Sequence, residues 1–388
     1  MTRTVTVGMI GYRFMGKAHS HAYHDVGMFF PSDVVPVKKV ICGRTRSAVE
    51  EAARVFGWQE AATDWEAVVS RPDIDIIDIN TPNHLHRDIA IAAARHGKAV
   101  FCEKPLAMDA VQAREMLDAV RAAKVKHLVA FNYRMVPALA LAKRLIDEGR
   151  IGVIRHFRAV YLQDWICDPS FPCVWRLQKE LAGSGVHGDL NAHLIDLARW
   201  LVGEFDRVVG MSETFVTERP CERTGGGLTT GLEARSDASA RRVTVDDATL
   251  FLARFKNGAL GSFESTRMAP GRRNGQRIEI NGSRGSIVFE QEDMNILWYY
   301  SQDDDKSVQG FKRIQVTEAV HPFTGAWWPA GHIIGYEHTF VHLVKELLDA
   351  IAQDRMPSPD FEDGFRCQVV LDAVMESARS GGWVAIRE

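Results

Sequence analysis

The strongest constraint on the fold is an alternation of short apolar runs with helical patterns through the first third of the chain. Segments such as SAVEEAARVFGW at residues 47–58 repeat their apolar residues with a helical period. The apolar runs lie at residues 4–11, 35–42, 75–80, 98–103 and 127–132. Strands that alternate with helices form a parallel sheet, and ligands bind at the carboxyl ends of its strands. We therefore predict a doubly wound α/β domain over residues 1–133.

The pattern changes in the remainder of the chain, residues 134–388. Residues 154–165 and 243–255 alternate apolar with polar side chains, which is typical of antiparallel strands with one covered face. Asn257 and Gly258 follow the second of these runs and predict a hairpin turn. We expect a second domain here, built on an antiparallel sheet.

Helices interrupt the strands of this second domain. One helix is expected over Val136–Glu148, closed by Gly149, and another begins near Val186. The segment 221–242 is rich in Gly, Ser, Thr and Arg and predicts a long mobile loop, for which a lid, an interface arm and an exposed connection are open alternatives. Two C-terminal helices are expected at residues 336–353 and 361–380.

Charge and cysteine content limit the possible partners. The net charge is −3, so neither nucleic acid nor an anionic membrane is an expected partner. The sequence shows no secretory leader, and no apolar run reaches the roughly 20 residues of a membrane span, so a cytoplasmic location is expected. The six cysteines lack metal or disulfide spacing and are expected to be reduced and mostly buried. The histidines of HSHAYH (19–24) and NHLH (83–86) are expected on helix surfaces or at the rim of the site, and no metal is expected.

Residues 8–16, GMIGYRFMG, carry two of the three glycines of a dinucleotide-binding turn. Gly11 suits the tight turn, and Gly16 suits close packing of helix on strand. Arg13 stands where the second glycine lets the backbone approach the pyrophosphate, and its guanidinium can offer a charged hydrogen bond to the same group. A plain strand-to-helix turn is the alternative.

The second predicted strand ends in CGRTR, without the Asp or Glu that accepts the ribose hydroxyls of NAD. Arg44 and Arg46 suit the 2′-phosphate of NADP, whereas Arg44 can also stack on the adenine of NAD. The site is therefore expected to bind a nucleotide, and these residues leave both cofactors open.

Four further motifs follow predicted strands or lie on a helix of the second domain. NTPNHLH (80–86), CEKP (102–105) and FNYR (131–134) follow the third, fourth and fifth strands, and GDLNAHLID places Asp189 and His193 four residues apart on one helical face. In this order they resemble the Gfo/Idh/MocA family of nicotinamide-dependent sugar and polyol dehydrogenases. The likeness runs nearly end to end, through YLQDW (161–165), VWR (174–176) and VDDATLFLARFKNGALGSFE (245–264).

The resemblance implies a Rossmann domain followed by an α/β domain on a large open, mainly antiparallel sheet, commonly assembled into homotetramers or homodimers. It also implies a cis peptide bond between Lys104 and Pro105. The family's catalytic lysine, aspartate and histidine fall on Lys104, Asp189 and His193. Oxidation of a secondary alcohol needs a base with a near-neutral pKa, which we expect His193 to be. Lys104 is expected to stabilise the developing alkoxide, and Asp189 to orient the substrate or the histidine.

The motifs and the resemblance together predict two sets of contacts. The expected cofactor contacts are Gly11, Arg13, Phe14, Met15, Arg44, Asn80, Thr81, Asn83, His86, Glu103, Lys104 and Asn132. The expected substrate contacts are Lys104, Gln163, Trp175, Arg176, Asp189 and His193, with Tyr161, Asp164, His187 and Asn191 as further pocket residues and His332 and Tyr336 as weaker candidates. Four tryptophans of the chain are candidates for the pocket: Trp165, Trp175, Trp327 and Trp328. At least half of these four are expected to pack in the core or in an interface instead.

Within the family, the chain resembles the subgroup of inositol, levoglucosan and L-glucose dehydrogenases. The predicted activity is oxidation of a ring hydroxyl of scyllo- or myo-inositol, or of a related sugar such as L-glucose, to the ketone. The resemblance favours NAD and the local arginines favour NADP, and we prefer NAD. The alternatives are oxidation of levoglucosan, another anhydrosugar or a glycoside at its third carbon, and a non-enzymatic ligand-sensing regulator on the same fold.

Overall fold

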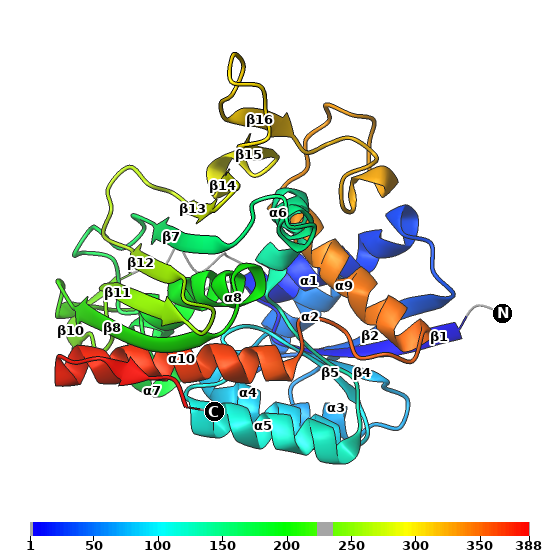
Figure 1. The fold of residues 1–388 in the computed structure, drawn as a ribbon. Helices are drawn as coiled ribbons and strands as arrows, with labels where there is room; N and C mark the ends of the chain where they lie inside the picture. The colour runs from blue at the N-terminus through cyan, green and yellow to red at the C-terminus, as the bar shows by residue number, and fades with distance from the viewer. Residues whose placement is uncertain (1–2, 223–235, 388) are drawn as a thin grey trace.

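The first domain of the computed structural model, which describes residues 3–222 and 236–387, is built on a parallel six-stranded sheet (Figure 1). The strand order is β3-β2-β1-β4-β5-β6. Successive strands are therefore added on one side of β1 up to β3 and on its other side from β4 onward. The strands are β1 (Arg3–Ile10), β2 (Val34–Cys42), β3 (Glu60–Ala62), β4 (Ile76–Ile79), β5 (Ala99–Cys102) and β6 (His127–Val129). The helices are α1 (Phe14–Phe29), α2 (Arg46–Phe56), α3 (Trp65–Val69), α4 (His86–Arg95) and α5 (Ala110–Ala123). The predicted doubly wound α/β fold is confirmed.

The central strands are apolar because helices cover both faces of this sheet. All four residues of β4 are buried, as are three of the four in β5, which is the pattern of a parallel strand covered on both sides. Asp78 breaks this apolar pattern in the middle of β4. The edge strand β3 was not predicted, because three residues are too few to show a period.

The second domain is built on a nine-stranded sheet in the order β16-β15-β14-β13-β7-β12-β11-β8-β17. Only β7 and β12 pair in parallel, so the expected large, mainly antiparallel sheet is confirmed. Gly258, with φ of +90°, turns the chain between β11 and β12 as predicted. The strands are β7 (Ile154–Leu162), β8 (Phe205–Glu213), β11 (Ala248–Phe255), β12 (Leu260–Thr266), β13 (Gly275–Gly282), β14 (Gly285–Glu290), β15 (Ile296–Ser301), β16 (Lys312–Gln315) and β17 (Val384–Ala385).

Helices cover one face of the nine-stranded sheet, and none of the described helices covers the other. The covering helices are α6 (Pro137–Asp147), which packs on β14 and β15, α8 (Ala192–Leu201), which packs on β7, and α10 (Phe361–Ser380), which packs on β8. Residues of β11 are alternately buried and exposed. Cross-strand pairing places five exposed apolar side chains on the opposite side, which we call the open face: Met211, Leu250, Leu252, Leu260 and Trp298.

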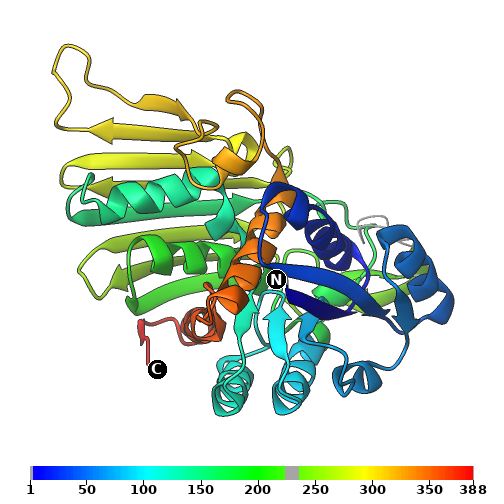
Figure 2. The same cartoon turned by 90° about the vertical axis from the view of Figure 1, so that its right-hand side faces the viewer.

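The helix α9 (Tyr336–Ala352) returns to the first domain. It packs against α1, β2 and the short helix Asn132–Met135, although it falls within the range expected for the second domain. Figure 2 shows α9 (orange) lying between the two sheets. The helix α10 packs on α5 as well as on β8, so it joins the two domains.

The segment 221–242 differs from the expected long loop. Its two ends belong to β9 (Glu218–Glu222) and β10 (Ser236–Arg242), which pair antiparallel. Backbone hydrogen bonds stabilise this ribbon. Its sequence is polar and has no apolar period, so the two strands could not be predicted from the sequence. Residues 223–235, the centre of the predicted loop, lie outside the described residues.

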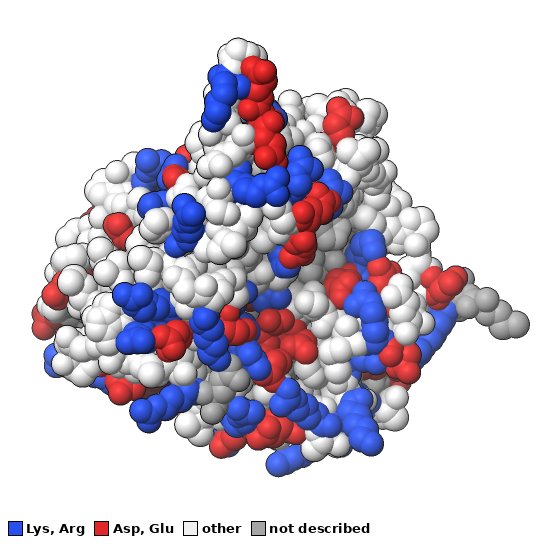
Figure 3. Space-filling view, in the orientation of Figure 1, with Lys and Arg blue, Asp and Glu red and all other residues white. Residues whose placement is uncertain are grey.

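Figure 3 shows positive and negative side chains interspersed over one face of the molecule. Within residues 3–222 and 236–387, no helix is long and apolar enough to cross a membrane. All six cysteines are free. Most of them are buried, as expected, namely Cys42, Cys102, Cys173 and Cys367.

Candidate active site

A cavity of about 1290 Å³ lies where the two domains meet. The first domain contributes the turns that follow its strands, including Gly11, Asn80 and Lys104, and the second domain contributes Asp189 and His193. Single small-molecule sites usually measure roughly 300–1000 Å³. The cavity is therefore large enough for a dinucleotide and a sugar together.

The turn between β1 and α1 needs its two glycines. Gly11 has φ of +109°, and a Cβ there would lie 2.4 Å from the carbonyl oxygen of Asn80. A Cβ on Gly16 would lie 2.3 Å from the carbonyl oxygen of Gly11. Arg13 has φ of −77°, which any residue adopts, so its backbone does not require the missing glycine. Among the described residues, no side chain caps the first turn of α1, and such free N–H groups suit a pyrophosphate.

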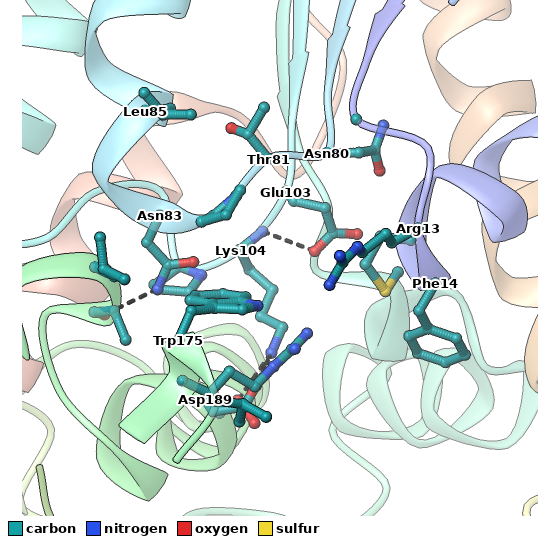
Figure 4. A pocket seen from close by; sticks show the side chains of 18 of the residues that line it. Arg13, Phe14, Asn80, Thr81, Asn83, Leu85, Glu103, Lys104, Trp175 and Asp189 are labelled. Carbon is teal, nitrogen blue, oxygen red and sulfur yellow. Dashed lines mark hydrogen bonds and ion pairs between the residues drawn. The ribbon is translucent and has the colours of Figure 1, made fainter. Parts of the chain in front are cut away.

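Polar atoms at the end of β4 fit a bound cofactor. The Asn80 Oδ1 and the Thr81 Oγ1 are buried and have no hydrogen-bond partner among the described residues. Buried polar atoms normally have a partner. Both residues line the cavity, as does Glu103 at the end of β5, which faces Arg13 in Figure 4. The residues present therefore suit the hydroxyl and amide groups of a nicotinamide riboside.

The two arginines that follow β2 point in different directions. Arg44 lines the cavity, whereas Arg46 points to the first-domain surface, where it donates to the Thr63 Oγ1 at 3.1 Å. The carboxylates that line the cavity belong to Glu103, Asp164 and Asp189, and none of them follows β2. Of the two arginines, only Arg44 therefore lines the cavity.

Lys104 and Asp189 join the two domains across the cavity (Figure 4). The Lys104 Nζ donates to the Asp189 Oδ1 at 2.7 Å and to the Asp189 carbonyl at 3.0 Å. The peptide bond before Pro105 is cis, as the resemblance implied. The other Asp189 oxygen accepts from Arg267. Burial opposes the charge of Asp189, but Lys104 and Arg267 hold its pKa well below 3.8, so it stays ionised.

His193 lies beside this pair in α8. Its ring centroid is 4.3 Å from that of Tyr133, and its Nδ1 is buried without a partner among the described residues. Burial and the charge of Lys104 lower the pKa of His193 well below 6.5. This pKa is lower than the near-neutral value expected from the sequence. A neutral imidazole at neutral pH can still accept a proton.

Two features hold Asp189 and His193 in place. Asp189 lies in a π-helical segment, His187–Asn191, that leads directly into α8, so the predicted single helix has two windings. Such wider turns are common at functional sites. Asp196, further along α8, accepts from Arg134 at 2.5 and 2.9 Å. This buried ion pair anchors the helix that carries His193.

Most of the predicted site residues line the cavity. Besides those already placed, they are Phe14, Met15, Asn83, Asn132, Tyr161, Gln163, Trp165, Trp175, Arg176 and Tyr336. Trp327 packs on Phe29 and Phe30, and Trp328 packs on Phe29. Half of the four tryptophans therefore serve packing, as expected.

Besides Arg46, four predicted residues do not line the cavity. His86 is buried behind it, with ring nitrogens 3.0 and 3.1 Å from the carbonyls of Thr81 and Pro105. His187 and Asn191 contact each other at 3.0 Å in the interior. His332 lies on an exposed turn.

The histidines expected on the surface or rim include two that are fully buried, His19 and His86. The expectation is wrong for both, because each has polar partners that compensate for burial. In the described part of the chain, no group of three or more His, Cys, Asp or Glu side chains could hold a metal ion.

Sequence reasoning missed several residues that line the cavity, among them Tyr133, Arg267, Arg273 and Asn274. The Asn274 Oδ1 accepts from the Tyr161 hydroxyl at 2.7 Å and from the Gln163 Nε2 at 3.0 Å. Arg267 directly follows β12, and a charged residue at the end of a strand is the only signal that could have indicated it.

Comparisons with known proteins give the family of this chain. A family described as "Oxidoreductase family, NAD-binding Rossmann fold" matches residues 5–131, and "GFO/IDH/MocA C-terminal domain" matches residues 139–288. Levoglucosan dehydrogenase of Pseudarthrobacter phenanthrenivorans is 44 % identical over 99 % of this chain and 98 % of its own length. The chain belongs to the Gfo/Idh/MocA family. It is thus an oxidoreductase with an NAD-binding domain, which confirms the predicted enzyme class and the preference for NAD.

Two further comparisons bear on the substrate. Inositol 2-dehydrogenase of Rhizobium meliloti is 26 % identical over 99 % of each chain. The solved structure of levoglucosan dehydrogenase in complex with NADH and levoglucosan has a TM-score of 0.93 and 43 % identity, and covers 99 % of this Gfo/Idh/MocA chain and 100 % of its own.

Proposed function

We propose that the protein is an NAD-dependent dehydrogenase that oxidises a secondary ring hydroxyl of levoglucosan or a related anhydrosugar to the ketone. This proposal is supported most by the convergence of Lys104, Asp189 and His193 on a cavity that is also lined by the dinucleotide turn. Identity of 44 % to a levoglucosan dehydrogenase favours an anhydrosugar. The inositols and L-glucose, expected first from the sequence, become the second candidates.

Each of the three residues has a separate task in this reaction. NAD, when bound, accepts the hydride from the carbinol carbon. His193 is neutral and accepts the hydroxyl proton. Lys104 donates a hydrogen bond to the same oxygen and stabilises its negative charge, an effect that is stronger in a site screened from water. Asp189 holds the lysine in place.

The first domain supplies the groups that hold NAD. The free N–H groups of the first turn of α1, with Arg13, suit the pyrophosphate. Arg44, which lines the cavity, would hold the adenine. Asn80, Glu103 and Asn132 also line the cavity and would hold the nicotinamide riboside.

The second domain supplies the groups that recognise a polyol ring. Arg176 lies 4.5 Å from the ring centroid of Trp175 and has no ion-pair partner among the described residues. It is therefore free to donate to substrate hydroxyls. Trp175 offers an apolar face for the carbon ring, and Gln163 a further polar contact.

A second copy of the chain covers the open face in this proposal. Monomeric proteins rarely expose contiguous apolar patches of this kind, and Met211, Leu250 and Leu252 are all exposed there. The assembly is a homodimer or a homotetramer, as the family resemblance implies.

A spectrophotometric screen tests the proposed activity. Purified protein is mixed with NAD or NADP and, in turn, with levoglucosan, scyllo- and myo-inositol, L-glucose and a glycoside, and the absorbance of the reduced cofactor is followed. We expect reduction of NAD, fastest with levoglucosan. Reduction with an inositol alone would move the substrate to the second candidate, and no reduction by any polyol would refute the proposal.

A further inference from the structure

A fully buried histidine, His19, joins β4 to the end of β5, two strands of the first domain that lead to the cavity. The His19 Nδ1 lies 3.0 Å from both carboxylate oxygens of Asp78, and the Nε2 lies 3.1 Å from the Glu103 Oε1. Its ring stacks on Phe101 at 4.6 Å, with Phe340 of α9 on another side at 5.3 Å. Because both ring nitrogens face carboxylates, both donate, and the ring is an imidazolium.

Further hydrogen bonds connect the two carboxylates to residues in the wall of the cavity. The Asp78 Oδ1 also accepts from the Asn80 Nδ2 at 2.7 Å, and the Glu103 Oε2 accepts from the Lys104 backbone N–H at 3.0 Å. Asn80, Glu103 and Lys104 line the cavity, whereas His19 and Asp78 do not. The chain of contacts therefore has its centre in the core and its two ends in the site.

We infer that His19 is a positioning residue, whose imidazolium orients Glu103, and Asn80 through Asp78, toward the bound NAD. This inference rests on the proposed function. The network of one imidazolium and two carboxylates has a net charge of −1. Without the imidazolium, the two carboxylates would repel each other across a buried site. This repulsion would move Glu103 and Asp78 out of the positions that they occupy here.

The titration of His19 agrees with this geometry. Burial alone would lower its pKa, but the charges and hydrogen bonds of Asp78 and Glu103 outweigh burial and raise the pKa from 6.5 to about 9. The ring therefore keeps its charge at neutral pH.

The test compares a charge-removing variant with a charge-matched one. His19→Gln changes the network to −2, and we expect NADH, titrated by fluorescence, to bind at least about tenfold more weakly. The KM for NAD should rise and kcat fall, while the KM for the sugar stays near its wild-type value. In the double variant His19→Gln with Asp78→Asn, the charge returns to −1 without a change in side-chain shape at position 78. We expect this variant to recover most of the NADH affinity, which a packing role alone would not produce.

His342→Gln is the matched control. His342 is also fully buried, and its ring nitrogens lie 2.8 Å from the Trp327 Nε1 and from the Met135 carbonyl, outside the cavity. We expect it to lower the melting temperature and to leave NADH affinity unchanged.

Wild-type NADH affinity in His19→Gln, or a folded double variant that binds NADH no better than the single one, would overturn the inference. If His19→Gln does not fold, the double variant decides, because folded protein with wild-type NADH affinity supports the role and folded protein without it refutes it. A wild-type protein that binds NADH and oxidises no polyol would refute the proposed function, and NADH binding by the variants would still test His19.

Discussion

At the scale of single residues, Asp189 divides its carboxylate between two cations. One oxygen accepts from Lys104 and the other from Arg267, which is only 1 % exposed. A lysine ammonium has three donors, and the Asp189 carboxylate and carbonyl take two of them. The third donor remains for the substrate oxygen. Because Arg267 occupies the second carboxylate oxygen, it keeps Asp189 turned so that Lys104 reaches the site.

Replacement of Arg267 should therefore impair catalysis. We expect Arg267→Met to lower kcat/KM by about 10- to 100-fold, since Asp189 loses one of its two partners. Arg267→Lys should retain part of the activity, because the charge is kept and the planar fork is lost. Steady-state kinetics measure both, and Arg272→Met, which changes an exposed arginine outside the cavity, is the control. Equal kcat/KM for Arg267→Met and Arg272→Met would contradict the role.

The sequence predicts some of these residues and not others. Lys104, Asp189 and His193 lie in motifs with recognisable neighbours. Arg267 belongs to no motif, and only the pairing of β12 brings it beneath Asp189. The low pKa of His193 follows from burial and from Lys104, and both depend on how the two domains meet.

At the scale of elements, the His19 network ties α1 to β4 and β5. A histidine whose pKa is higher in the folded state than in the unfolded state contributes stability that is complete below the unfolded pKa and is lost as pH rises through the folded pKa. For His19 these values are 6.5 and about 9. Tyr23, one turn further along α1, stays neutral over this range, because burial and the charge of Asp78 raise its pKa well above 10.

We therefore expect the free energy of unfolding to fall by about 3 kcal/mol from about pH 6 to about pH 10 through this one group. Urea unfolding across this range measures the loss. The double variant His19→Gln with Asp78→Asn lacks the titrating ring and should lose about 3 kcal/mol less. Parallel loss of stability in the two proteins would show that His19 does not titrate as proposed.

The elements themselves were predictable where a period was visible. The central strands, α6, α8 and the hairpin at Gly258 follow directly from apolar spacing and turn residues. The ribbon of β9 and β10 carries polar residues held by backbone pairing, and the π-helical turn at Asp189 differs from an α-helix only in winding. Neither feature changes the spacing of apolar residues in the sequence, so neither could be predicted from it.

At the scale of the whole molecule, the open face predicts self-association. Leu252 lies on β11 within this face and is 53 % exposed. We expect the wild type to be a dimer or a tetramer by light scattering, and Leu252→Asp to have a lower mass, because a charge buried in an apolar interface is costly. Val111→Asp, at an exposed position on α5, should leave the mass unchanged. A monomeric wild type, or one unaffected by Leu252→Asp, would contradict this arrangement.

The central claim is that a lysine from one domain and a histidine from the other act on a single hydroxyl. The rate of NADH formation in a single turnover tests it in four proteins: the wild type, Lys104→Met, His193→Ala and the double variant, each shown by titration to bind NADH. We expect each single change to slow the step by at least about 100-fold, and the double variant to be no slower than the slower single one, because groups that serve one oxygen act as a unit. Losses that multiply in the double variant would contradict the claim.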